Sequence, residues 1–180
     1  MFKQIPNWLT GFRIVIIPIF VLTFFFEGRG ANLFAAMLFI IACITDFLDG
    51  YLARLWKVQS SLGRFLDPIA DKLLVAAALI MLLHENRADV IPALLIISRE
   101  ILVSGLREYL AEIQVPLPVS RLGKWKTGLQ MGALVLLIAG TEGTGLALTE
   151  WLGRIALWIS AGITVYSGYA YLNASLKHID

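Results

Sequence analysis

Long apolar stretches alternate with short polar segments along the whole chain. The apolar stretches span about residues 8–26, 32–55, 66–83, 90–110, 126–139 and 151–172. Most of them approach the roughly 20 residues that an α-helix needs to cross the hydrocarbon core of a bilayer. The pattern predicts an all-α fold: an integral membrane bundle of six transmembrane helices, with a short amphipathic segment leading in at the N-terminus.

The composition is typical of a membrane protein. Of the 180 residues, 58% are hydrophobic and 16% are charged, and the mean hydropathy is +0.78. A chain of this length has room for one bundle and little else, so residues 1–180 are expected to form a single transmembrane domain. Lys3 and Arg13 precede the apolar run Ile14–Phe26, as basic residues precede the apolar part of a signal sequence. Because Glu27-Gly28-Arg29 is a poor cleavage context, we expect an uncleaved first span.

Basic residues are distributed unevenly over the segments between the apolar stretches. Of the 15 Lys and Arg residues, only Arg29, Arg87 and Arg154 fall on the side opposite the N-terminus. Positively charged flanks tend to stay in the cytoplasm. The bias therefore predicts a multi-pass protein with a cytoplasmic N-terminus. The spread of basic residues over membrane-facing turns argues against nucleic acid as a partner.

Four aspartates lie in or beside apolar stretches. Asp46 and Asp49 are in the second half of the second stretch, and Asp67 and Asp71 are at the start of the third. One carboxylate at bilayer depth costs ~2.5–3.5 kcal/mol, so four without counter-charge would cost on the order of 10 kcal/mol. Bound divalent metal is the simplest source of the missing positive charge. The predicted orientation places all four aspartates at the cytoplasmic end.

Helical spacing gathers these carboxylates on two narrow faces, since successive residues are rotated by ~100°. The residues concerned are Asp46, Asp49, Gly50 and Ala53 on the second predicted helix, with Arg54 at the edge of their face, and Gly63, Asp67 and Asp71 on the third. The small residues among them allow a ligand or another backbone to approach closely. The two acidic faces, joined by a short turn, are predicted to face each other.

The ligand atoms that these residues provide limit which metal ions can bind. Oxygen ligands without His or Cys nearby favour Mg²⁺ or Mn²⁺ over zinc. Four carboxylates can hold two such ions ~3.5–4 Å apart. Two metal ions at a membrane surface suit a diphosphate substrate, and one carboxylate can act as a general base toward an acceptor hydroxyl. The alternative is a pair of ordinary helix ends whose charge is neutralised by Arg54, Arg64 and Lys72.

Several basic residues share the cytoplasmic half with the aspartates and can bind a second anionic substrate. They are Arg13, Lys72, Arg99, Arg107, Lys124 and Lys126. Arg99 lies well inside an apolar stretch, where a cation is usually functional or paired; the alternative is a structural ion pair with Glu100 or another span. Arg107, Lys124 and Lys126 have the alternative role of anchoring helix ends at anionic headgroups.

The aspartate pattern resembles the signature of the CDP-alcohol phosphatidyltransferases. It reads Asp46-x2-Asp49-Gly50-x2-Ala53-Arg54-x8-Gly63-x3-Asp67-x3-Asp71, complete and with the spacing of that family. The similarity extends through most of the chain, in the segments Ile5-Pro6-Asn7-Trp8-Leu9-Thr10-x2-Arg13, Arg99-Glu100-x6-Arg107-Glu108 and Gly123-Lys124-x-Lys126-Thr127-x2-Gln130. Within that family, this chain most resembles the members that act on glycerol 3-phosphate.

The resemblance implies a transfer of the phosphatidyl group from CDP-diacylglycerol to the hydroxyl of glycerol 3-phosphate. The products would be phosphatidylglycerol phosphate and CMP. By analogy, two divalent cations would bind to Asp46, Asp49, Asp67 and Asp71, and Asp71 would deprotonate the acceptor hydroxyl. The implied CDP-binding residues are Asn7, Thr10, Asp49, Gly50, Ala53, Arg54 and Gly63, of which Asn7 and Thr10 have helix capping as an alternative role.

The resemblance also implies a location in the bacterial cytoplasmic membrane, with the active site facing the cytoplasm and the lipid bilayer as a partner. Small residues in the last apolar stretch, Gly162, Ser167, Gly168 and Ala170, are typical of helix packing, and we expect a homodimer.

Two alternatives remain open at the level of sequence. The acceptor can instead be serine, inositol phosphate or phosphatidylglycerol, which competing acceptors would distinguish. A protein of another class, a small cation or proton carrier, would also use intramembrane carboxylates. Carriers usually bind near the bilayer midplane between repeated halves, whereas here the carboxylates are at one end and no repeat is visible.

Overall fold

The computed structural model describes the backbone of residues 5–56, 61–113 and 121–176, and the side chains of 11–48, 50–51, 66, 69–113 and 125–173. These residues form six helices: α1 (Ile5–Thr23), α2 (Arg29–Trp56), α3 (Ser61–His84), α4 (Val90–Glu112), α5 (Arg121–Thr144) and α6 (Leu148–Leu176). The described residues contain no strand. The predicted all-α class is confirmed.

Five of the six helices are longer than the apolar stretches that predicted them, whereas α1, expected over 8–26, ends at Thr23. α3 begins at Ser61, ahead of the expected start near Leu66, and α5 extends from Arg121 to Thr144. Polar residues do not prevent a helix from continuing beyond its apolar part, so hydropathy marks the buried length of a helix and not its ends. The turn expected over 140–148 was also too long, because the chain bends sharply at Gly140 and then completes another helical turn.

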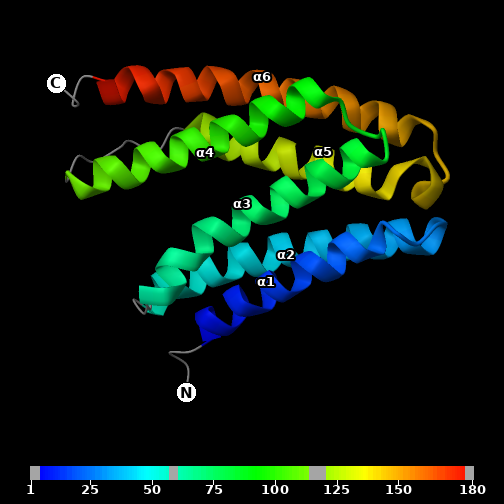
Figure 1. Ribbon diagram of the computed structural model, residues 1–180, viewed down its shortest axis with the longest axis horizontal. Coiled ribbons are helices and arrows are strands. Elements are labelled where there is room, and N and C mark those ends of the chain that lie inside the picture. The colour runs from blue at the N-terminus through cyan, green and yellow to red at the C-terminus, as the bar shows by residue number, and fades with distance from the viewer. Residues whose placement is uncertain (1–4, 57–60, 114–120, 177–180) are drawn as a thin grey trace.

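The six helices form two groups joined along one side (Figure 1). α1 packs against α2 and α3, while α6 packs against α4 and α5; contacts of α2 with α5, and of α3 with α4 and α5, connect the groups. The three short connections α1–α2, α3–α4 and α5–α6 lie together at one end of the bundle. We call this the turn end. α1, α3 and α5 begin at the other end, the open end, where the two groups diverge.

Aromatic and aliphatic side chains form one core that begins within the group of α1, α2 and α3 and extends into the other group. The ring of Phe20 on α1 lies 5.8 Å from that of Phe39 on α2, centroid to centroid, and both side chains are fully buried. Leu79, Leu134 and Ile138 extend this core into α3 and α5. Burial of apolar area is the main source of stability for such a core in water, whereas between helices in lipid close packing takes over that role.

Two stretches within the described residues are long and apolar enough to cross a membrane, Arg29–Leu48 and Leu148–Asn173, and Gly11–Thr23 is a shorter apolar one. The other predicted spans fall short by this measure. Charged residues inside α3 and α4, among them Asp71, Lys72, Arg99 and Glu100, lower the hydropathy of those helices. These criteria therefore support a membrane location without establishing six spans.

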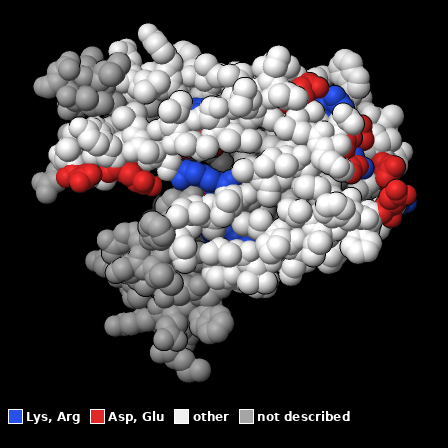
Figure 2. All heavy atoms as spheres, viewed as in Figure 1, with Lys and Arg blue, Asp and Glu red and all other residues white. Residues whose placement is uncertain are grey.

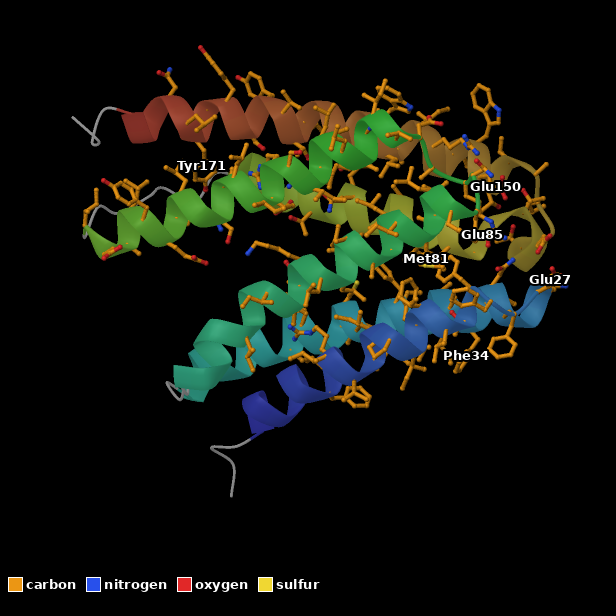
Figure 3. All side chains as sticks on the ribbon, viewed as in Figure 1. Glu27, Phe34, Met81, Glu85, Glu150 and Tyr171 are labelled. Atoms are coloured by element: carbon orange, nitrogen blue, oxygen red, sulfur yellow. The ribbon has the colours of Figure 1, made fainter. Side chains whose placement is uncertain are left out.

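Charged side chains at the turn end are matched with partners of opposite charge. Nη2 of Arg87 lies 3.7 Å from Glu85 and 3.9 Å from Glu142. Figure 3 places Glu85 and Glu150 at this end, beside the bend in α5. At that bend Gly140 has φ 59°, and a Cβ there would lie 2.8 Å from Nη1 of Arg87. The glycine thus permits a backbone conformation that L-residues rarely adopt.

Candidate functional site

A buried arginine pairs with the first aspartate of the signature. The side chain of Arg13, on α1, has no exposed area, and its Nη1 lies 2.7 Å from Oδ1 of Asp46 on α2. The Asp46 side chain is 39% exposed, so this carboxylate lies at the edge of the packed region. A buried guanidinium needs such a partner because an unpaired buried charge is strongly unfavourable. The contact joins the first helix to the acidic face of the second.

The aspartates of α2 and α3 lie near each other. Asp71 on α3 is close enough to Asp46 for the two negative charges to repel, and it also feels the charges of Glu100, Arg13 and Lys72. Carboxylates that share a site in this way are costly without additional positive charge. One aspartate from each predicted acidic face, Asp46 and Asp71, thus lies near the other, while the side chains of Asp49 and Asp67 fall outside the described residues.

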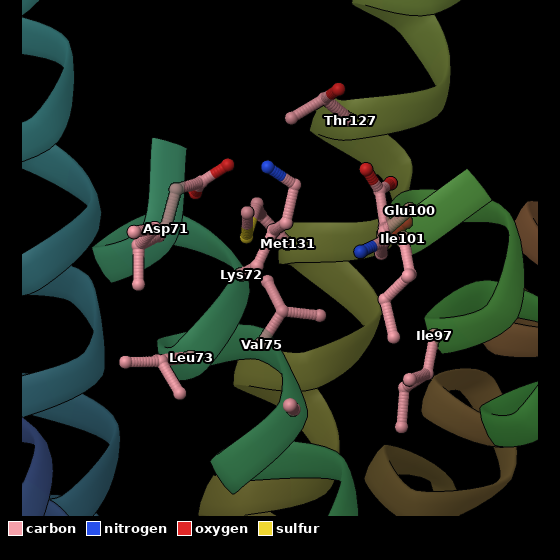
Figure 4. A pocket seen from close by; sticks show the side chains of 12 residues that line it. Asp71, Lys72, Leu73, Val75, Ile97, Glu100, Ile101, Thr127 and Met131 are labelled. Carbon is pink, nitrogen blue, oxygen red and sulfur yellow. The ribbon is translucent and has the colours of Figure 1, made fainter. Parts of the chain in front are cut away.

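A cavity of about 290 Å³ opens beside Asp71, between α3, α4 and α5. Its polar lining consists of Asp71, Lys72, Glu100, Thr127 and Gln130, and the remaining lining side chains are apolar. Figure 4 shows Asp71 and Lys72 projecting from α3 toward Thr127 on α5 and Glu100 on α4. A mostly apolar pocket with a few converging polar groups is the usual form of a small-molecule site.

Glu100 organises the basic residues behind this cavity. Its Oε1 accepts a hydrogen bond from Nζ of Lys126, a side chain only 2% exposed, and its Oε2 lies 3.6 Å from Nη1 of Arg99. Lys126 also interacts electrostatically with Asp71. The sequence singled out Lys126 and Arg99 as phosphate-binding candidates but treated Glu100 only as a structural partner of Arg99. Its role as the shared partner of two cations depends on the α4–α5 contact.

Two arginines of α4 contact the same tyrosine of α6. The guanidinium of Arg99 lies 6.0 Å from the centroid of the Tyr171 ring, and that of Arg107 lies 5.2 Å away. Arg107 donates a hydrogen bond of 3.0 Å to the Tyr171 hydroxyl, and Arg99 donates one of 3.2 Å to Ser167. Gly168 allows this approach, since a Cβ there would lie 3.0 Å from Cγ of Arg99. Both arginines therefore bridge α4 and α6.

The structure tests only part of the predicted site. Predicted residues with described side chains or, for glycine, a described environment are Arg13, Asp46, Gly50, Asp71, Lys72, Arg99, Arg107 and Lys126. The side chains of Asn7, Thr10, Asp49, Ala53, Arg54, Asp67 and Lys124, and the surroundings of Gly63, lie outside the described residues. Among the described side chains, no group of three or more His, Cys, Asp or Glu residues could hold a metal ion. Two of the four proposed ligands are thus in view.

The described basic residues of the predicted acceptor site fall into two groups. Arg13 and Lys72 belong to the side of α1, α2 and α3, and both interact with Asp71. Arg99, Arg107 and Lys126 belong to the side of α4, α5 and α6. Figure 2 shows basic side chains inside a hollow between the two halves of the molecule, and acidic and basic side chains mixed at the turn end. The hollow thus contains basic side chains, and acidic side chains lie beside it at the open end.

Comparison of the sequence with known proteins identifies a matching family. The family described as CDP-alcohol phosphatidyltransferase matches residues 3–166. A Rickettsia felis protein is 49% identical over 176 residues, covering 98% of this chain and 97% of its own length. A Rickettsia typhi protein is 51% identical over 172 residues, covering 96% and 97%. A Sodalis glossinidius protein is 42% identical over 176 residues, covering 96% and 94%. Each is named CDP-diacylglycerol–glycerol-3-phosphate 3-phosphatidyltransferase.

Proposed function

Because the chain belongs to the CDP-alcohol phosphatidyltransferase family, we propose that it transfers the phosphatidyl group of CDP-diacylglycerol to glycerol 3-phosphate. The products are phosphatidylglycerol phosphate and CMP. The named relatives from three bacteria carry the name of this reaction and cover nearly the full chain. The family membership expected from the aspartate signature is thereby confirmed.

One observation supports this proposal most directly: a cavity bordered by Asp71, which lies beside a second carboxylate and a set of buried cations. The carboxylates suit a metal-bound diphosphate, and the cations suit an acceptor that carries a phosphate. The cavity of about 290 Å³ is at the lower end of the size range for small-ligand sites. A small polyol phosphate fits such a volume, whereas the lipid tails of the donor would remain outside it.

The described donors fit divalent cations of the Mg²⁺ or Mn²⁺ type. Asp46 and Asp71 supply oxygen ligands from two facing helices, and Asp49 and Asp67 lie one helical turn away on the same helices. When bound, such ions offset the negative charge and stabilise the phosphate leaving group. Arg13 already places one positive charge against Asp46, so the cluster contains part of the compensation it needs.

The reaction is a nucleophilic displacement at phosphorus. The primary hydroxyl of glycerol 3-phosphate loses its proton to the carboxylate of Asp71 and bonds through its oxygen to the lipid-side phosphorus. The bond from that phosphorus to the bridging oxygen breaks, and the bridging oxygen leaves with CMP. Asn7, Thr10, Asp49, Gly50, Ala53, Arg54 and Gly63 line the cytidine diphosphate site in this proposal. Lys126, held by Glu100, interacts with the charge of Asp71 and in this proposal attracts the acceptor phosphate. The further basic residues of that site are Arg99, which also pairs with Glu100, and Arg13, Lys72, Arg107 and Lys124.

The proposal places the protein in the cytoplasmic membrane of a bacterium, with six spans and its open end toward the cytoplasm. Apolar helices and the basic residues concentrated at the open end support this orientation. A water-soluble acceptor would reach a charged site at this end of the bundle from the cytoplasm. The homodimer expected from the small residues of α6 remains a prediction, and cross-linking in native membranes would test it.

An assay of CMP release tests the proposed function. Membranes containing the protein should release CMP when given CDP-diacylglycerol, glycerol 3-phosphate and Mg²⁺, and omission of any one should abolish release. Serine, inositol phosphate and phosphatidylglycerol would serve as competing acceptors in the same assay. A preference for one of these would overturn the acceptor but keep the reaction class. Ion flux in proteoliposomes that lack CDP-lipid, without CMP release in the complete assay, would favour a carrier instead.

A further inference from the structure

Gln130 combines burial with an unsatisfied polar atom. It lines the cavity beside Asp71, its side chain is only 2% exposed, and its Oε1 is buried without a hydrogen-bond partner in the part of the chain that the structure describes. Leaving a buried polar atom unpaired costs about 1–3 kcal/mol. More than nine in ten such groups in folded proteins have a partner. An exception at the wall of a cavity indicates that the partner is a ligand.

The other polar residues of the lining are already engaged. Glu100 accepts the hydrogen bond of Lys126, Asp71 interacts with the charges around it, and Lys72 and Thr127 each take part in an interaction. Gln130 differs from the charged residues of this lining because its side chain is neutral. An amide oxygen pairs with a neutral donor at little electrostatic cost, and a hydroxyl can donate to it or accept from the amide nitrogen.

We propose that Gln130 hydrogen-bonds the hydroxyl of the acceptor that does not react, and thereby selects acceptors with two hydroxyl groups. The inference rests on the proposed function and deepens it, since it identifies what distinguishes one acceptor from another. Glycerol 3-phosphate has a second hydroxyl between its reacting carbon and its phosphate. Serine has an ammonium and a carboxylate instead, neither of which is a neutral hydroxyl. Sites built to bond a substrate hydroxyl discriminate strongly against analogues that lack it.

The test compares two acceptors that differ in one oxygen atom, glycerol 3-phosphate and 3-hydroxypropyl phosphate. CMP release from CDP-diacylglycerol gives kcat/KM for each acceptor. The wild-type protein should prefer glycerol 3-phosphate by about 10- to 100-fold, because the analogue leaves the buried amide unpaired. In Gln130→Met, which keeps the length of the side chain but removes the amide, the preference should fall to within about threefold.

Met131→Leu is the matched control, since Met131 lines the same cavity but has no amide group to hydrogen-bond a hydroxyl of the acceptor. It should retain the wild-type preference even if its overall rate falls. An equal loss toward both acceptors in Gln130→Met would indicate a purely structural role and would overturn the proposal. A wild-type protein that uses both acceptors equally would overturn it without any variant. If the wild-type protein released no CMP with glycerol 3-phosphate, the proposed function itself would fail.

Discussion

The two ends of the bundle carry similar kinds of charge, and both contain ion pairs, but they differ in how completely their polar groups are matched. At the turn end, each described ion pair joins opposite charges: Arg87 faces Glu85 and Glu142, and Arg154 lies 3.1 Å from Asp89. Asp89 also accepts a hydrogen bond of 2.7 Å from the indole of Trp158. These charged groups therefore find their partners within the protein, and their contacts hold the ends of the helices together.

The open end instead brings like charges together around a cavity. Asp71 is near both Asp46 and Glu100, and the amide oxygen of Gln130 in the lining has no hydrogen-bond partner among the described residues. Such an arrangement destabilises the protein unless a ligand completes it. The number of charged residues would not distinguish the two ends. The neighbouring like charges and the unpaired amide oxygen at the open end do.

Replacement of one aspartate at each end should separate the two regions most clearly. In Asp71→Asn we expect a loss of CMP release of about 10²- to 10⁴-fold, because the amide cannot accept the proton of the acceptor hydroxyl. Asp89→Asn, the matched variant at the turn end, should retain activity close to that of the wild type. Both proteins should insert in membranes to the same extent. Wild-type turnover in Asp71→Asn would contradict the assignment of the base.

Removal of the buried ammonium should have the next largest effect. Lys126→Met keeps much of the side-chain volume but leaves Glu100 without its hydrogen-bond donor. The variant also loses the proposed hydrogen bond from the ammonium to the acceptor phosphate. Hydrogen bonds to charged groups are worth about 1.5–3 kcal/mol, so KM for glycerol 3-phosphate should rise by about 10- to 100-fold. Saturation curves for each substrate in turn measure this.

The increase should be much smaller for CDP-diacylglycerol than for glycerol 3-phosphate, because Lys126 is held by Glu100 on the α4–α5 side of the cavity. Lys126→Arg preserves the charge and should recover part of the acceptor affinity. Equal increases in both values of KM would show that the ammonium supports the site as a whole and has no special relation to the acceptor.

A substitution at the turn end should change stability and spare activity. Gly140→Ala forces an L-residue to adopt φ 59° and ψ −175°, at a cost of about 1–3 kcal/mol. The apparent melting temperature in detergent should therefore fall, while kcat measured well below that temperature should be unchanged. Gly128→Ala in the same helix, where a Cβ would meet nothing within 4 Å, is the control. Loss of kcat in Gly140→Ala without loss of stability would show that the two ends are coupled.

Local pattern was sufficient to predict the helices and the identity of the acidic faces. Apolar runs of near-membrane length and the spacing of Asp46, Asp49, Asp67 and Asp71 are properties of neighbouring residues, and helical geometry converts them directly into faces. The errors lay in the helix ends: α3 begins at Ser61, ahead of its apolar run, and the chain bends at Gly140 and then forms a further helical turn. The backbone conformation of Gly140 causes the second error, and the number of apolar residues around it does not reveal that conformation.

The sequence by itself thus determined an all-helical chain and the placement of Asp46 with Asp49 on one helix and of Asp67 with Asp71 on the next, because both follow from local spacing. Only the tertiary structure decided that Arg13 pairs with Asp46, that Glu100 binds Lys126, and that Gln130 faces a cavity with no partner. These relations join residues on different helices. They depend on how the helices pack, which the order of residues along one helix does not specify.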